Sequence, residues 1–110
     1  MDLNLVVLSG RLAADPEVRE FESGSRLVRY LMTVRSDEPG RRVDVVPVTR
    51  WNPTPDDEAR VRGDRVWVTG TLQRRFWTAN EGRRSRVEII ATHVTLRDET
   101  EPLTVGPEPT

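Results

Sequence analysis

Apolar and polar residues alternate along much of this chain with a period of two, which β-strands produce and helices do not. In residues 28–34 apolar side chains stand at every second position, at Val28, Tyr30, Met32 and Val34, and alternate with Arg29, Leu31 and Thr33. Other runs are richer in apolar residues, as buried strands are. The pattern predicts five strands, the second interrupted by a turn at 22–25, over residues 3–12, 18–34, 43–51, 65–77 and 83–96.

One short helix is predicted between the third and fourth strands. Thr54 can cap its N-terminus, Pro55 suits the first helical position, and the acids at 56–58 complement the positive end. Gly63 ends it after about two turns. Three strands, a helix and two strands is the layout of the OB-fold, an all-β, five-stranded Greek-key barrel that binds oligonucleotides and oligosaccharides.

The chain of 110 residues has the length of one domain. We expect an OB-fold domain over residues 1–97, and an acidic, proline-containing disordered tail over 98–110. The longest apolar run is short and the N-terminus lacks the pattern of a signal peptide, so a cytoplasmic protein without a membrane segment is expected.

Charge and metal-ligand content restrict the classes of function. Residues 1–97 hold 17 arginines against 14 acids, a mildly basic balance that is compatible with nucleic-acid binding. The chain has no cysteine and one histidine, His93, so no thiolate or histidine metal site is expected, and no other cofactor. The acids at 56–58 leave a carboxylate-metal nuclease as an alternative, but a helix N-terminus accounts for all three. We therefore expect a binding protein and no enzyme.

The fourth and fifth strands form a predicted hairpin that is the main candidate site. Its connection, residues 78–82, contains the Asn and Gly that short hairpin loops favour. Two adjacent rings, Phe76 and Trp77, lie beside many cations and one acid, Glu81. Rings stack on bases and guanidinium groups bind phosphates, so the hairpin predicts a nucleic-acid contact. Its five basic candidates are Arg74, Arg75, Arg83, Arg84 and Arg86.

Further candidates lie outside this hairpin. Trp51 ends the third strand between polar neighbours and is a second candidate for base stacking. Arg11, Arg35 and Arg50 are additional candidates for phosphate contacts.

Some outward apolar positions suggest contact between copies of the chain. Trp67 alternates with two core valines, so its ring should point away from the core. With Leu5 and Val7 of the first strand, and the outward Leu31, it is expected to lie in an oligomer interface.

Several stretches resemble the bacterial single-stranded DNA-binding protein family, in the same order and spacing over residues 4–97. Residues 4–12, Asn-Leu-Val-Val-Leu-Ser-Gly-Arg-Leu, are similar to the family's opening strand, and 15–19, Asp-Pro-Glu-Val-Arg, to its Asp-Pro-Glu-x-Arg turn. Residues 62–72 resemble its Lys-Gly-x-x-Val-x-Val-x-Gly-x-Leu pattern, and 75–77, Arg-Phe-Trp, its Arg-x-Trp hairpin.

The resemblance implies a homotetramer of OB-folds that binds single strands without sequence preference. By position, Trp77 and Trp51 match stacking aromatics, Arg75 matches a basic hairpin position, and Arg62 matches a basic residue before the glycine. Val45 departs from the pattern, because many members have a stacking aromatic there. The family's tail tip of acids and Pro-Phe is also missing, so recruitment of replication proteins through the tail is not expected.

The sequence thus predicts a nucleoid-associated protein that binds single-stranded DNA in replication, repair or recombination. Base stacking and arginine contacts to phosphates would carry the binding, and single-stranded RNA is a second cargo that the same chemistry accepts. An alternative stays open, in which the OB-fold has lost part of its DNA surface and serves as a protein-interaction module.

Overall fold

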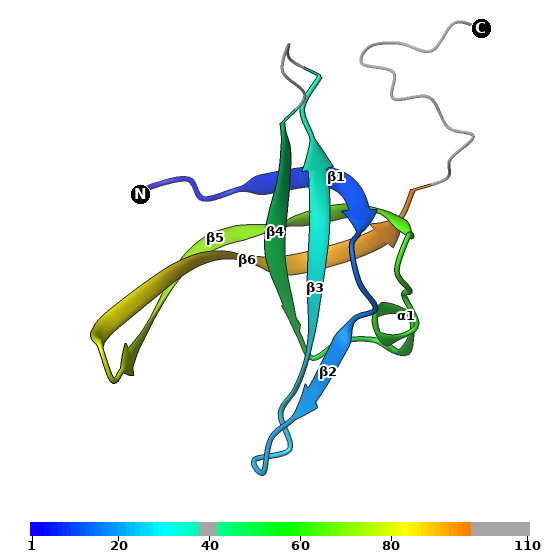
Figure 1. The fold of residues 1–110 in the computed structure, drawn as a ribbon. Coiled ribbons are helices and arrows are strands. Elements are labelled where there is room, and N and C mark those ends of the chain that lie inside the picture. The colour runs from blue at the N-terminus through cyan, green and yellow to red at the C-terminus, as the bar shows by residue number, and fades with distance from the viewer. Residues whose placement is uncertain (38–41, 98–110) are drawn as a thin grey trace, which may run out of the picture.

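The structure is a computed structural model that describes residues 1–37 and 42–97. This part of the chain is almost entirely strand (Figure 1). Its elements are β1 (Val6–Leu12), β2 (Glu17–Glu20), β3 (Arg26–Arg35), β4 (Val43–Trp51), α1 (Pro55–Glu58), β5 (Arg65–Ala79) and β6 (Gly82–Leu96). The predicted tail, residues 98–110, lies outside the described residues.

The strands form one sheet in the order β1-β5-β6-β4-β3-β2, and β1 also pairs with β3. That last pairing, Arg11 with Thr33 and Leu12 with Met32, closes β1, β3, β4, β6 and β5 into a barrel. β4 and β6 run parallel at Val48 and Thr49, and the other pairs are antiparallel. The predicted all-β, five-stranded OB-fold is confirmed. The additional strand, β2, pairs with β3 alone, so the predicted interrupted strand is a hairpin of two.

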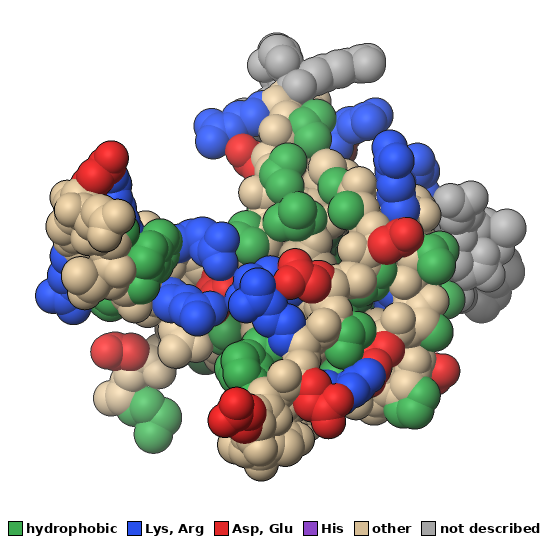
Figure 2. All heavy atoms as spheres, turned by 60° about the horizontal axis from the view of Figure 1, so that its bottom comes forward, with side chains coloured by type: hydrophobic (Ala, Val, Ile, Leu, Met, Phe, Trp, Pro, Cys, Tyr) green, Lys and Arg blue, Asp and Glu red, His purple; other side chains and the backbone are tan. Residues whose placement is uncertain are grey.

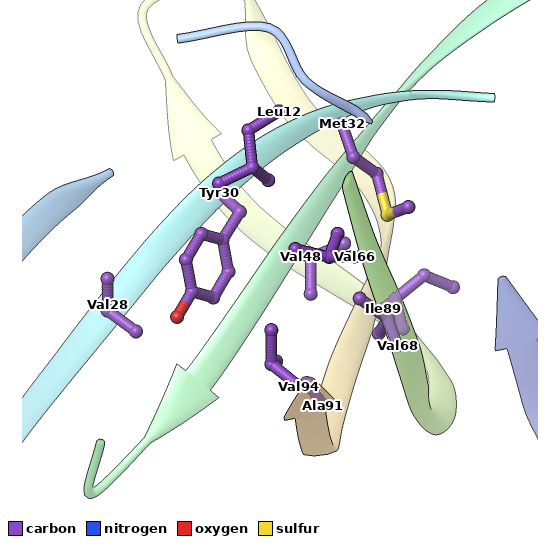
Figure 3. Close-up of a cluster of buried hydrophobic side chains, with 10 residues drawn as sticks. All are labelled: Leu12, Val28, Tyr30, Met32, Val48, Val66, Val68, Ile89, Ala91 and Val94. Atoms are coloured by element: carbon purple, nitrogen blue, oxygen red, sulfur yellow. The ribbon is translucent and has the colours of Figure 1, made fainter. Parts of the chain in front are cut away.

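The barrel encloses one apolar cluster, to which every strand of the closed barrel contributes (Figure 3). The even-numbered residues of β3 point inward, as the alternation predicts. Tyr30 is buried among them, and its hydroxyl donates a hydrogen bond to the backbone oxygen of Asp57 at 2.5 Å. This bond ties α1 to the end of the barrel.

Two glycines allow strands to approach closely. A side chain on Gly10 would meet the backbone oxygen of Thr33 at 2.2 Å, where β1 turns from β5 to β3. One on Gly70 would meet the backbone oxygen of Ile90 at 2.1 Å. The irregularity in the ladder between β5 and β6 falls beside Gly70, at Thr69/Gly70.

Helix α1 is shorter than the predicted two turns. Thr54 caps it as expected: its hydroxyl accepts from the Asp57 N–H at 3.1 Å, and the Asp57 carboxylate accepts from the Thr54 N–H at 2.8 Å. Ala59 forms the C-cap, and soon after it the Val61 N–H donates to the Asp64 carboxylate at 2.9 Å, outside the helical pattern. Within residues 1–37 and 42–97, no helix is long and apolar enough to span a membrane.

Candidate nucleic-acid interface

The far half of β5 and β6 leaves the barrel as a two-stranded ribbon (Figure 1). It is tighter at its tip than predicted, because Ala79 pairs with Gly82 and only Asn80 and Glu81 form the turn. Gly82 has a φ of 111°, a conformation that glycine adopts without strain. All side chains of 72–78 on β5 are exposed, as are those of 82–87 on β6. Rings and guanidinium groups on this ribbon therefore face solvent.

The ladder register divides the candidate residues between two faces. Trp77 lies opposite Arg84, and Arg75 opposite Arg86. The intervening residues point the other way, with Phe76 opposite Ser85. We name the two sides by their rings. The tryptophan face consists of Gln73, Arg75, Trp77, Arg84, Arg86 and Glu88. The phenylalanine face consists of Leu72, Arg74, Phe76, Thr78, Arg83, Ser85 and Val87.

The tryptophan face presents a ring and two cations to solvent. Trp77 is 44% exposed. Arg84 forms an ion pair with Glu81, whereas no carboxylate among the described residues pairs with Arg75 or Arg86. Like charges directly opposite in a ladder are destabilising, so this pair of arginines indicates a surface shaped for an anion.

The phenylalanine face has its own ring and cations. The guanidinium carbon of Arg83 lies 4.4 Å from the centre of the Phe76 ring, which is a cation–π contact. Arg74 donates a hydrogen bond to the hydroxyl of Ser85 across the ribbon at 3.1 Å. Phe76 itself remains 51% exposed.

A second aromatic platform lies at the end of β4. Trp51 is 45% exposed and stacks on Phe21, with ring centres 5.8 Å apart and planes inclined by 25°. Leu27, opposite Trp51 in the ladder, is buried. Phe21 was not among the predicted site residues. Its signal in the sequence was the turn at 22–25, which folds β2 back on β3 and brings Phe21 toward the residues that pair with the end of β4.

The two platforms lie on the same side of the sheet, and the residues that link them, Thr49 and Glu88, are buried. Thr49 lies two residues before Trp51, on the same side of β4. Its hydroxyl donates to the carboxylate of Glu88 at 3.1 Å, and Glu88 belongs to the tryptophan face. The structure thus places the two predicted stacking residues, Trp51 and Trp77, on the same side of the sheet. Figure 2 shows basic side chains running from the projecting ribbon to the middle of the molecule.

Arg50 is held by protein groups at the end of the barrel. Its guanidinium donates to the Asp57 carboxylate at 3.3 Å, and to the backbone oxygens of Ala91 and Thr92. Burial alone would raise the pKa of Asp57, but hydrogen bonds from Thr54 and Arg50 outweigh it and hold that pKa below its usual range. These contacts give Arg50 a structural role, and its assignment to DNA remains a prediction.

Three other predicted arginines lie away from the ribbon. Arg11 and Arg35 line a surface groove where β1 meets β3, with Arg65 and Arg97 beside them. Arg62 lies in the turn after α1, where its N–H donates to Asp15 at 2.9 Å. In Figure 1 α1 and the ribbon lie on opposite sides of the barrel. The assignment of these arginines to DNA remains a prediction.

The predicted oligomer residues form a patch on the outer face of β1 and β5. Leu5 and Val7 are exposed, and Val7 pairs with Thr69, two residues from Trp67. Trp67 is half-buried, with the guanidinium carbon of Arg97 at 5.9 Å from its ring centre. Leu31 is exposed on β3, apart from this patch.

Two of the three acids of α1 have structural partners. Asp57 is held as described, and Glu58 forms an ion pair with Arg26 at 2.5 Å. In residues 1–37 and 42–97 no three His, Cys, Asp or Glu side chains are placed to hold a metal ion.

Comparison with known proteins identifies the family. The model of the single-strand binding protein family matches residues 3–97. The chain belongs to this family. A single-stranded DNA-binding protein from Treponema pallidum is 30% identical over 102 residues, covering 86% of this chain and 58% of that protein. One from Halalkalibacterium halodurans is 34% identical over 99 residues, covering 84% of this chain and 59% of that protein.

Other proteins of known structure have the same fold. A Plasmodium falciparum SSB, solved in complex with ssDNA, superposes with a TM-score of 0.79 over 89% of this chain and 97% of its own, at 21% identity. That likeness supports the OB-fold. The chain spans less than two thirds of the length of these two bacterial relatives.

Proposed function

We propose that this protein binds single-stranded DNA without sequence preference and so protects or organises it in replication, repair or recombination. The observation that carries the proposal is the pair of exposed aromatic platforms on one side of the sheet: Trp77, with Arg75 and Arg86 beside it, and the Trp51–Phe21 stack. Exposed rings accept any base, and guanidinium groups bind phosphates. The relatives named above, single-stranded DNA-binding proteins, support the same cargo.

The energetics follow from these two kinds of contact. A base stacked on Trp77 or Trp51 would contribute about 1–3 kcal/mol. Each phosphate that an arginine neutralises would add roughly −0.7 to the slope of log affinity against log salt concentration. Single-stranded RNA presents similar base faces and phosphates, so we expect the protein to discriminate only weakly between DNA and RNA.

We also propose that the protein assembles into a homo-oligomer, a tetramer by analogy with the family. The exposed Leu5 and Val7 beside Trp67 support this, because such an apolar patch is stabilised when a second copy covers it. Sedimentation equilibrium of the wild type and of Val7→Asp tests the patch, and a variant that keeps the wild-type mass would contradict its role.

The function is tested by titrating a fluorescently labelled oligo-dT with the protein at two salt concentrations, following the anisotropy of the label. The label reports binding even where a tryptophan has been removed. Trp77→Ala should weaken binding roughly 10-fold to 100-fold, and Trp77→Phe should retain most of the affinity because a ring remains. Absence of binding by the wild type at low salt would refute the proposal and favour the protein-interaction module.

A further inference from the structure

The phenylalanine face of the ribbon lies on the side opposite Trp77. Neighbouring residues of a strand point to opposite sides, so Phe76 and Trp77 project from opposite faces of the same ribbon. A base stacked on Trp77 therefore cannot also contact Phe76. Because the ribbon projects from the barrel, neither face is covered there by another element of the described chain (Figure 1).

The charges of the phenylalanine face are complementary to phosphate. It holds two guanidinium groups, those of Arg74 and Arg83, and none of its described residues is acidic. Both groups are held in place, Arg83 over the Phe76 ring at 4.4 Å and Arg74 by Ser85 at 3.1 Å. Orientation of this kind reduces the side-chain entropy that is lost when a ligand binds.

The same face can also accept a base. Phe76 is half exposed although Arg83 lies over its ring, and Leu72 and Val87 are exposed toward the barrel. A ring with a guanidinium beside it is the combination that contacts single strands, where the ring takes the base and the cation takes the phosphate. The tryptophan face has the same combination, so the ribbon repeats it on both sides.

We propose that the phenylalanine face is a second binding site for single-stranded nucleic acid, so that one ribbon holds two segments of strand, one on each side. This inference rests on the proposed function. Two segments on one ribbon would allow a protomer to bridge two strands, or two passes of the same strand, with no contribution from a second copy of the chain.

The test counts short oligonucleotides per protomer by native mass spectrometry, using the full chain and an oligo-dT of about six nucleotides, a length within the site sizes of OB-folds. The double variant Phe76→Ala/Arg83→Ala should bind one oligonucleotide fewer per protomer than the wild type. Trp77→Ala should lose a different one, so that combining all three substitutions removes both. Val61→Ala, at an exposed residue of the turn after α1 and outside both faces of the ribbon, is the control and should keep the wild-type count.

A second measurement leaves the phenylalanine face unaltered. Photo-crosslinking of an oligonucleotide that contains iodo-deoxyuridine should label Phe76 both in the wild type and in the Trp77→Ala variant. An unchanged count in the Phe76 variant, or loss of the Phe76 crosslink when Trp77 is removed, would overturn the second site while single-strand binding stands. A wild type that binds no oligonucleotide would refute both proposals.

Discussion

The barrel and the ribbon are built from the same two strands but differ in what their side chains do. Along the first part of β5, Val66 and Val68 are buried in the core. Beyond Gly70, β6 is the only strand that pairs with β5, and the side chains of 72–78 are exposed. Burial of apolar area stabilises the barrel, whereas the ribbon relies on its ladder and turn. The ribbon side chains are thus available for a ligand.

The same substitution in the two regions should give the largest contrast. Leu12 is 2% exposed in the barrel, and Leu72 is 49% exposed on the ribbon. Leu12→Ala removes buried methyl groups and leaves a cavity, so we expect it to lower the free energy of unfolding by about 2–5 kcal/mol. Leu72→Ala should change it by about 0.5 kcal/mol or less. Urea denaturation followed by circular dichroism measures both, and equal losses would contradict the distinction.

The next effect concerns the end of the barrel, where Asp57 joins Arg50, Thr54 and α1. Asp57→Asn should lower the free energy of unfolding by about 1–3 kcal/mol at neutral pH, since charge-assisted hydrogen bonds are lost. The folded state lowers the pKa of Asp57, so its contribution is present above the ordinary aspartate pKa of about 4 and is lost as pH falls through the lowered value. The difference between wild type and variant should therefore shrink below that pH.

Two further variants separate structure from binding at this position. Asp56→Asn, at an exposed neighbouring acid, should cost less stability. Arg50→Gln should lower the melting temperature while leaving oligo-dT affinity unchanged. A loss of affinity at unchanged stability would restore Arg50 as a DNA contact.

The sequence was sufficient for the barrel because its signals are local. Alternation fixed which face of β3 is buried, and the order of strands and helix predicted the OB-fold, which the structure confirms. The length of α1 was overestimated. The acids and Gly63 suggested two turns, but the contacts that follow the helix, such as Asp64 with the Val61 N–H, depend on a turn conformation that composition does not reveal.

The sequence predicted many of the residues of the site but not how their side chains are arranged. A count of arginines in the hairpin does not say that Arg75 faces Arg86, or that Arg74 and Arg83 point the other way, because this depends on a register set by a two-residue turn. Phe21 was missed because its stacking on Trp51 requires both the β2–β3 and the β3–β4 pairings. Long-range register of this kind is determined by the fold.

A smaller effect is expected at the Trp51–Phe21 stack, where exposed rings like those of the ribbon lie at the end of a barrel strand. Phe21→Ala removes the ring that supports Trp51, so we expect oligo-dT affinity to fall by about 0.5–1.5 kcal/mol, the energy typical of aromatic pairs. Anisotropy titration measures the loss, and Phe21→Tyr, which keeps a ring, is the control. If both variants bind as the wild type does, Trp51 does not need this support.

The smallest effect is expected at two arginines that should lower stability while they favour DNA binding. Arg75 and Arg86 face each other in the ladder, and mutual repulsion should cost about 0.2–1 kcal/mol of stability. A double-mutant cycle with Arg75→Thr and Arg86→Thr should return a repulsive coupling of that size. The higher strand propensity of threonine cancels in the cycle. Each substitution should also reduce the salt slope of DNA binding by about 0.7. Attractive coupling, or a slope that does not change, would show that these arginines do not hold phosphates at the expense of stability.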